Sequence, residues 1–61
     1  MNSPGTVERA FQLARSGKFE NIVLLEKALH REGFEAARSH LGSPGIRAQL
    51  TALLREARQS G

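Results

Sequence analysis

The stretch from Asn21 to Gly33, N-I-V-L-L-E-K-A-L-H-R-E-G, decides the fold of this chain. Its residues Ile22, Leu25 and Leu29 recur at the spacing that places side chains on one face of an α-helix. Asn21 is a residue type that caps a first helical turn, and Gly33 suits the left-handed position that ends a helix. The apolar run at 22–25 also allows a strand, but good helix formers continue without a turn residue as far as Gly33. The stretch therefore predicts a helix over residues 22–32.

This helix is expected to lie between other helices. With Val23, Leu24 and Ala28 added, its apolar face is wider than one neighbouring helix can cover. Phe34, just beyond the glycine, is expected to pack back on Leu29, as residues after a glycine cap often do. The rest of the chain must therefore supply the cover on more than one side.

An amphipathic segment precedes the central helix and predicts a helix over residues 6–16. Thr6 is the expected cap, because Glu8 then falls in the first turn, where a negative charge is favourable. Gly17 closes the segment. The apolar residues recur at helical spacing, at Val7, Ala10, Phe11 and Ala14.

Two further segments follow the central helix. Phe34, Ala37 and Leu41 share a face and predict a short helix over 35–41, which Gly42 stops. Ser43 and Pro44 then have the order of a cap and a first helical residue, and they open a last helix over 44–59. The apolar stripe of this helix is the strongest after that of the central helix and comprises Ile46, Leu50, Leu53, Leu54 and Ala57.

Together these segments predict one all-α domain over residues 1–61. It is a small bundle of three to four short helices with frayed ends at 1–5 and 60–61. A chain of 61 residues without cysteine has a small core and no disulfide to support it, so we expect stability to be completed by homo-oligomerisation, as a dimer. Val23, Leu24 and Leu53 are the apolar residues expected at that interface or at an interface with a partner helix.

The composition argues against an enzyme. Four short helices leave little volume for a water-poor pocket, so we expect no catalytic residue, no cofactor and no small-molecule substrate. A metal site is also not expected, because His30 and His40 are the only imidazoles and aspartate and cysteine are absent. Both histidines are expected at the surface. No signal-peptide pattern and no apolar run of about 20 residues occur, so a cytoplasmic protein without membrane contact is expected.

Basic residues suggest a nucleic-acid partner. The nine basic residues include seven arginines, and the formal net charge is +3. On the last helix Arg47, Arg55 and Arg58 fall within about 80° of one another, beside the apolar stripe. This strip is a solvated edge that covers the core margin, a surface for phosphate groups, or a surface for an acidic protein partner. With Gln49 added, these are the residues that we expect at DNA.

Residues 41–50, L-G-S-P-G-I-R-A-Q-L, are similar to the turn and second helix of the DNA-reading helix-turn-helix. An apolar residue usually follows the glycine of that turn, whereas this chain has Ser43 there. The helix before the turn is also short. A tight helix corner that does not bind DNA accounts for the same residues.

A second resemblance covers most of the chain. Residues 10–17, A-F-Q-L-A-R-S-G, then 29–34, L-H-R-E-G-F, and 46–50, I-R-A-Q-L, are similar to short bacterial proteins of unassigned function. These proteins share an L-A-R-S-G turn and a helix that ends in E-G and an aromatic residue. The resemblance implies a helical fold and a bacterial setting, and it carries over no binding or catalytic residue.

The sequence therefore leaves two functions open, and both are non-enzymatic. The first is a small helical module that binds nucleic acid or acts as a regulator through its basic strip. The second is a module for self-association or protein interaction through its apolar faces. Salt separates them, because phosphate binding weakens steeply as salt rises and an apolar interface responds little.

Overall fold

The protein is a bundle of four helices, shown here as a computed structural model that describes residues 5–60, with side chains through residue 59. No strand occurs in this part of the chain, so the predicted all-α fold is confirmed. The Cα radius of gyration is 10.8 Å, close to the value of about 10.5 Å that a compact domain of this length has. The helices are α1 (Thr6–Ala14), α2 (Ile22–Arg31), α3 (Ala37–His40) and α4 (Pro44–Ser60).

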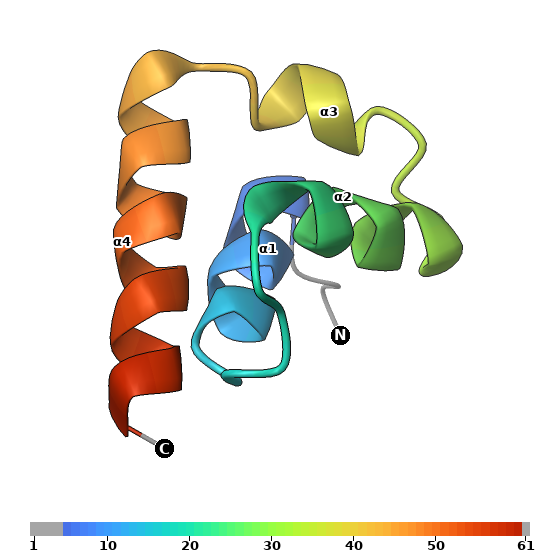
Figure 1. The fold of residues 1–61 in the computed structure, drawn as a ribbon. Coiled ribbons are helices and arrows are strands. Elements are labelled where there is room, and N and C mark those ends of the chain that lie inside the picture. Colours follow the sequence, from blue (N-terminus) through green and yellow to red (C-terminus); the bar gives the residue numbers. More distant parts are fainter. Residues whose placement is uncertain (1–4, 61) are drawn as a thin grey trace.

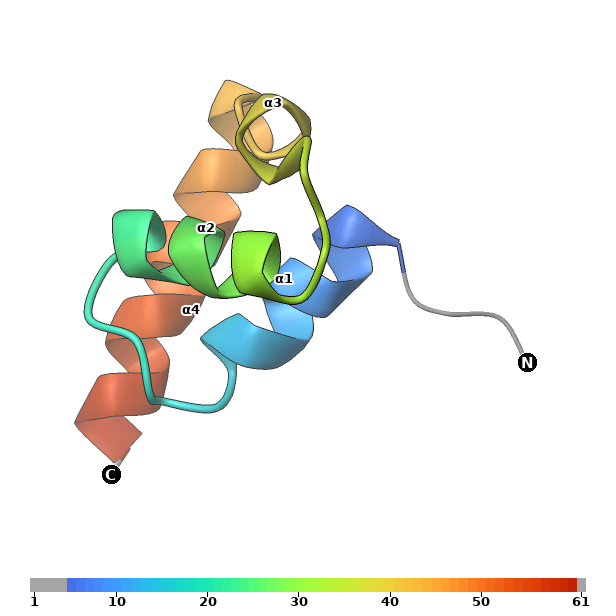
Figure 2. The same ribbon diagram turned by 90° about the vertical axis from the view of Figure 1, so that its right-hand side faces the viewer.

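The helices are arranged around α1 and α2. The long α4 stands along one side of the molecule, and α3 lies above α2 near the start of α4 (Figure 1). After a quarter turn about the vertical axis, α2 lies beside α1 and in front of α4 (Figure 2). Each of α1 and α2 contacts all three other helices, and within residues 5–60 α3 and α4 have no direct contact. The central helix is therefore covered by several neighbours, as its wide apolar face predicts.

The core is built from apolar residues of all four helices and of the turn after α3. Leu25, Leu29, Leu41, Leu50 and Leu54 are its largest fully buried side chains. On α1 the buried positions are Ala10 and Ala14, whose small side chains allow close approach of the other helices. The remaining buried residues are Ile22 and Ala37.

The ends of α2 are formed by the residues that the sequence indicates. The Asn21 side chain accepts a hydrogen bond from the Leu24 N–H at 3.0 Å. At the other end Gly33 has φ +98°, and its N–H donates to the carbonyl of His30, while the Phe34 N–H donates to that of Leu29. This is the Schellman pattern of a glycine-capped helix. Phe34 packs against the core, as predicted.

Helix α1 begins at Thr6, as predicted, but its cap differs from the prediction. Gly5, rather than Thr6, is the N-cap residue, and its carbonyl accepts from the Arg9 N–H at 2.9 Å. Gly5 has an extended backbone, and glycine is about as favourable as threonine at this position. Helix α1 also ends at Ala14, because the Ser16 hydroxyl donates to the carbonyl of Leu13 at 2.6 Å and competes with further helical turns.

The other helix boundaries differ by one or two residues. Helix α3 begins at Ala37 instead of residue 35, because residues 35–36 form a turn that follows the cap of α2. Pro44 is the first residue of α4, as predicted, and the Ser43 carbonyl accepts from the Arg47 N–H. Helix α4 continues through Ser60, so the expected fraying at 60 is not seen. Residues 1–4 and 61 lie outside the described part.

Candidate functional site

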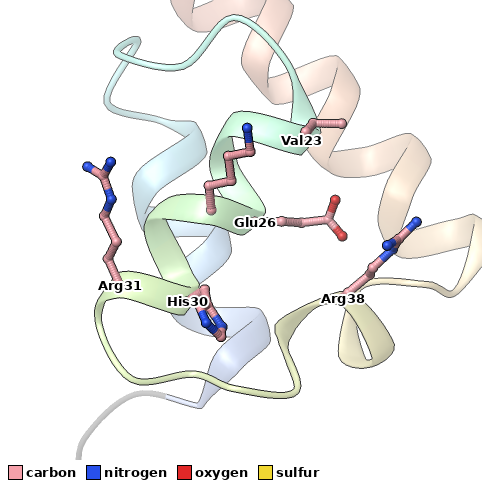
Figure 3. A pocket seen from close by; sticks show the side chains of 6 residues that line it. Val23, Glu26, His30, Arg31 and Arg38 are labelled. Carbon is pink, nitrogen blue, oxygen red and sulfur yellow. The ribbon is translucent and has the colours of Figure 1, made fainter.

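A hollow lies between α2 and α3. It has a volume of about 460 Å³, within the range of ligand pockets. Figure 3 shows the hollow with Glu26 and Arg38 extending into the space between the two helices. We call it the α2–α3 hollow, and its lining residues are Val23, Glu26, Lys27, His30, Arg31 and Arg38.

Helical periodicity places these side chains on the hollow. Positions 22, 25 and 29 of α2 are buried, so positions 23, 27 and 30 lie on the outward side. Lys27 and Arg31 are four residues apart and therefore neighbours on the helix surface, where like charges repel. Arg38 is added from α3. The lining thus includes an exposed valine and three permanent cations.

Glu26 is the exception in this hollow. Its Oε2 atom is buried and has no hydrogen-bond partner among the described residues. Arg38 lies across the hollow from it (Figure 3), but the two side chains form no ion pair. A buried carboxylate oxygen without a donor is unfavourable, because the water it loses is not replaced.

A second hollow, of about 310 Å³, lies where the loop before α2 meets the end of α4. Arg55 and Arg58 line it together with Glu20 and Gln59. Both arginines are exposed, and neither forms an ion pair with another described side chain. The two hollows share no lining residue.

Three of the four residues predicted for nucleic-acid binding share one side of α4. At about 100° per residue, Arg47, Arg55 and Arg58 fall within about 80°, and we call them the arginine strip. Arg47 is half-buried and the other two are exposed. Gln49 lies at least about 120° from each of the three, across the buried stripe from Arg47. The structure therefore does not bring Gln49 together with the arginine strip.

The apolar residues predicted for an interface are also divided. Val23 and Leu24 are 53% and 39% exposed on α2. Leu53 is half-buried against the core and lines a different hollow, with Arg15, Glu56 and Ala57. Leu53 thus contributes to packing, whereas Val23 and Leu24 are the large apolar side chains that are exposed in the described part of the chain.

The corner between α3 and α4 is anchored by Leu41. This residue is fully buried and directly precedes Gly42, so it supplies the apolar contact that the turn lacks at Ser43. Helix α3 has only four residues, which makes it much shorter than the first helix of a DNA-reading unit. The corner therefore fixes the start of α4 and does not by itself define a groove-reading pair.

An ion pair joins α1 to the end of α2. The Arg9 guanidinium donates to both carboxylate oxygens of Glu32, at 2.7 and 3.0 Å, and to the Gln12 side chain at 2.9 Å. The hydrogen bond from Arg9 lowers the pKa of Glu32, and the same bond raises the pKa of Arg9. The partners are 23 positions apart in the sequence, so no local pattern could have indicated the pair.

Basic residues are distributed unevenly. Six of the nine are on α2, α3 and α4, and we call this set the cationic face: Lys27, Arg31 and Arg38 at the α2–α3 hollow, with the arginine strip on α4. Only two glutamates, Glu20 and Glu26, line its hollows. With those two glutamates the face carries a formal charge of +4. The other basic residues are on α1 and the loop after it, where Glu32 pairs with Arg9.

The α2–α3 hollow was not predicted as a site, although the sequence holds a signal for it. Val23, Lys27 and Arg31 follow one another at intervals of four, which places an apolar residue and two cations in one row of a helix. The contribution of Arg38 depends on where α3 lies and could not be read from the sequence. His30 and His40 are exposed, as predicted.

Within the described residues no group of three or more histidine and glutamate side chains is placed to hold a metal ion. No described helix has the length and apolar character needed to cross a bilayer. The chain matches no family model, no curated protein and no solved structure.

Proposed function

We propose that this protein is a non-enzymatic module that binds the phosphate backbone of nucleic acid through the cationic face. The observation that carries the proposal is that six of the nine basic residues lie on α2, α3 and α4, while two glutamates line the hollows beside them. Surfaces of this kind attract polyanions and release bound counterions on association. The lack of cysteine fits a reducing cytoplasm, where such partners occur.

The state of the arginines supports this proposal. None of Arg38, Arg55 and Arg58 forms an ion pair with another described side chain, whereas Arg9 on α1 does. Their paired donors match the geometry of phosphate oxygens. From Arg47 to Arg58 the helix rises about 16 Å, and a nucleic-acid strand places about five phosphates over that length.

Salt-dependent binding tests the proposal. Anisotropy of labelled random-sequence DNA, measured between about 50 and 200 mM salt, should show affinity that falls steeply as salt rises. Replacing Arg55 and Arg58 together by Gln should weaken binding to every sequence and make the salt slope shallower by about 2. Replacing Arg15 and Lys18 together by Gln is the matched control, because it removes two exposed cations that lie after α1 and outside the cationic face. Equal losses in the two double variants would refute the assignment of the face.

A second candidate function is self-association as a dimer, or docking of a partner helix. The exposure of Val23 and Leu24, side by side on α2, favours it. Serine at both positions should then disperse an oligomer that light scattering detects at high salt. Leu53→Glu is not a suitable test, since Leu53 packs against the core and its loss would unfold the chain. An oligomer that persists in the serine variant would exclude this surface.

A further inference from the structure

We propose that the α2–α3 hollow takes one unpaired base of a nucleic-acid strand and that the Glu26 carboxylate accepts hydrogen bonds from that base, with guanine as the best fit. The inference rests on the proposed function and narrows it to single-stranded nucleic acid with a base preference. Its starting point is the contrast between the buried Oε2 of Glu26, which has no donor, and the three cations around it.

The ligand of this hollow must combine two opposite chemistries. An ionised carboxylate only accepts hydrogen bonds, so the group that reaches Glu26 must be a donor. Lys27, Arg31 and Arg38 only donate, so their ligand must be an anion. A phosphate alone satisfies the cations and is repelled by Glu26. A nucleotide satisfies both, because its phosphate accepts and its base carries N–H donors.

Val23 supplies the third requirement. Its side chain is 53% exposed at the rim of the hollow, where a flat base can cover it and remove apolar surface from water. Single-stranded nucleic acids are recognised in this way, with an unstacked base against a side chain and hydrogen bonds on its pairing edge. The volume of about 460 Å³ is sufficient for a small ligand group.

Guanine fits the carboxylate best among the bases. Its pairing edge presents a ring N–H and an amino group side by side, and this pair of donors matches the two oxygens of Glu26 after a side-chain rotation that opens the buried Oε2 to the hollow. Thymine has no amino group and presents a single ring N–H. In a duplex this edge is occupied by the paired base, so the hollow should not read double-stranded nucleic acid.

Arg38 is the alternative partner for Glu26 within the chain. The two side chains face each other across the hollow without an ion pair (Figure 3). If the purpose of Glu26 were to hold Arg38, replacing Glu26 would lower the stability of the fold and leave base preference unchanged. The experiment must therefore measure stability and base preference together.

Anisotropy with short labelled single strands tests the inference on the full chain at low salt. The first strand is all thymine, and the second carries isolated guanines among thymines. The third carries inosine, which lacks the amino group, at the positions of the guanines. Lithium salts prevent association of the guanine strands. We expect the guanine strand to bind at least about fivefold more tightly than the all-thymine strand, with inosine between them. Glu26→Gln should bring this ratio close to one, and Glu8→Gln on α1 should leave it intact.

The outcomes separate this inference from the function on which it rests. Equal binding of all three strands by the unaltered protein would overturn base reading at Glu26 and leave phosphate binding in place. Absence of binding to every strand would overturn both. If Glu26→Gln left the affinity ratio of the guanine and thymine strands unchanged and lowered the melting temperature, Glu26 would serve to hold Arg38 and the inference would be overturned. A glutamate-rich peptide that competes fully with the guanine strand would overturn the inference in favour of an acidic protein partner.

Discussion

Replacing Gly17 by alanine should destabilise the protein more than the same change at Gly33. Both glycines have positive φ, +76° and +98°, which costs a residue with a side chain about 1–2 kcal/mol. A Cβ at Gly33 would meet nothing within 4 Å, whereas at Gly17 it would lie 3.3 Å from the carbonyl oxygen of Ala57 on α4. Gly33→Ala therefore carries the backbone strain alone, and Gly17→Ala carries strain and crowding.

The two costs can be estimated separately. Alanine also reduces the conformational freedom of the unfolded chain, which stabilises the folded state by about 0.4–1 kcal/mol. Gly33→Ala should therefore lower the free energy of unfolding by about 1 kcal/mol. Crowding in a packed site adds about 1–3 kcal/mol, and a single contact at 3.3 Å belongs to the lower part of that range, so Gly17→Ala should lose about 2–3 kcal/mol. A chain of this length has a total stability of about 3–9 kcal/mol. The Gly17 variant therefore approaches the limit of folding.

Urea unfolding followed by circular dichroism measures both variants. With a slope of about 1 kcal/mol per molar urea, the midpoint should fall by about 1 M for Gly33→Ala and by about 2–3 M for Gly17→Ala. Gly17→Asn should recover part of the loss, because asparagine tolerates the left-handed conformation. Equal losses in the two alanine variants would refute the contact between Gly17 and Ala57. The second hollow, which depends on the same approach of α4 to the loop before α2, would then also be wrong.

Four further measurements test the fold and its charges. Leu50→Ala should lower the free energy of unfolding by about 2–5 kcal/mol in urea, because Leu50 is fully buried. Asn21→Ala removes the side-chain cap of α2 and should cost about 1 kcal/mol by the same assay. The hydrogen bond from Arg9 lowers the pKa of Glu32, so this pair stabilises the fold above the pKa of an unfolded glutamate, and the stability is lost as the pH falls through the folded pKa. Glu32→Gln should therefore make the urea midpoint depend less on pH between about pH 5 and about pH 2. Salt should raise the melting temperature of the free protein by screening the cationic face, and a constant melting temperature would contradict a clustered charge.

The sequence predicts those parts of the fold that depend on neighbouring residues. The cap at Asn21, the left-handed Gly33 and the return of Phe34 onto the core all involve residues a few positions apart, and all three are observed. The cap of α1 was predicted one residue late, at Thr6 instead of Gly5, because threonine and glycine are nearly equivalent caps and the choice depends on the backbone before the helix. Local preference thus places helices correctly and their ends approximately.

The candidate site depends on contacts that the sequence does not encode locally. The exposed side of α2 follows from its periodicity, but the α2–α3 hollow exists only because α3 crosses above α2 and adds Arg38. Leu53 was predicted at an interface as part of the apolar excess of the chain, and it packs against the core as a partly buried residue. Gln49 was grouped with the arginines because residues 41–50 are similar to a helix-turn-helix, whereas helical rotation separates it from them.

The charges on α2 also bear on self-association. Val23 and Leu24 are the large apolar side chains that the described part of the chain leaves exposed. A stable interface buries about 800 Å² from each partner, about a fifth of the 4416 Å² surface of this chain. Two side chains cannot supply that area, so Lys27 and Arg31 beside them would have to be included. A twofold dimer sets each surface against its own copy, and these cations would then face one another. Added salt must therefore strengthen a dimer that forms through this side of α2, because it screens the facing cations. The same salt weakens nucleic-acid binding. The two uses of this surface are therefore favoured at opposite ends of the salt range.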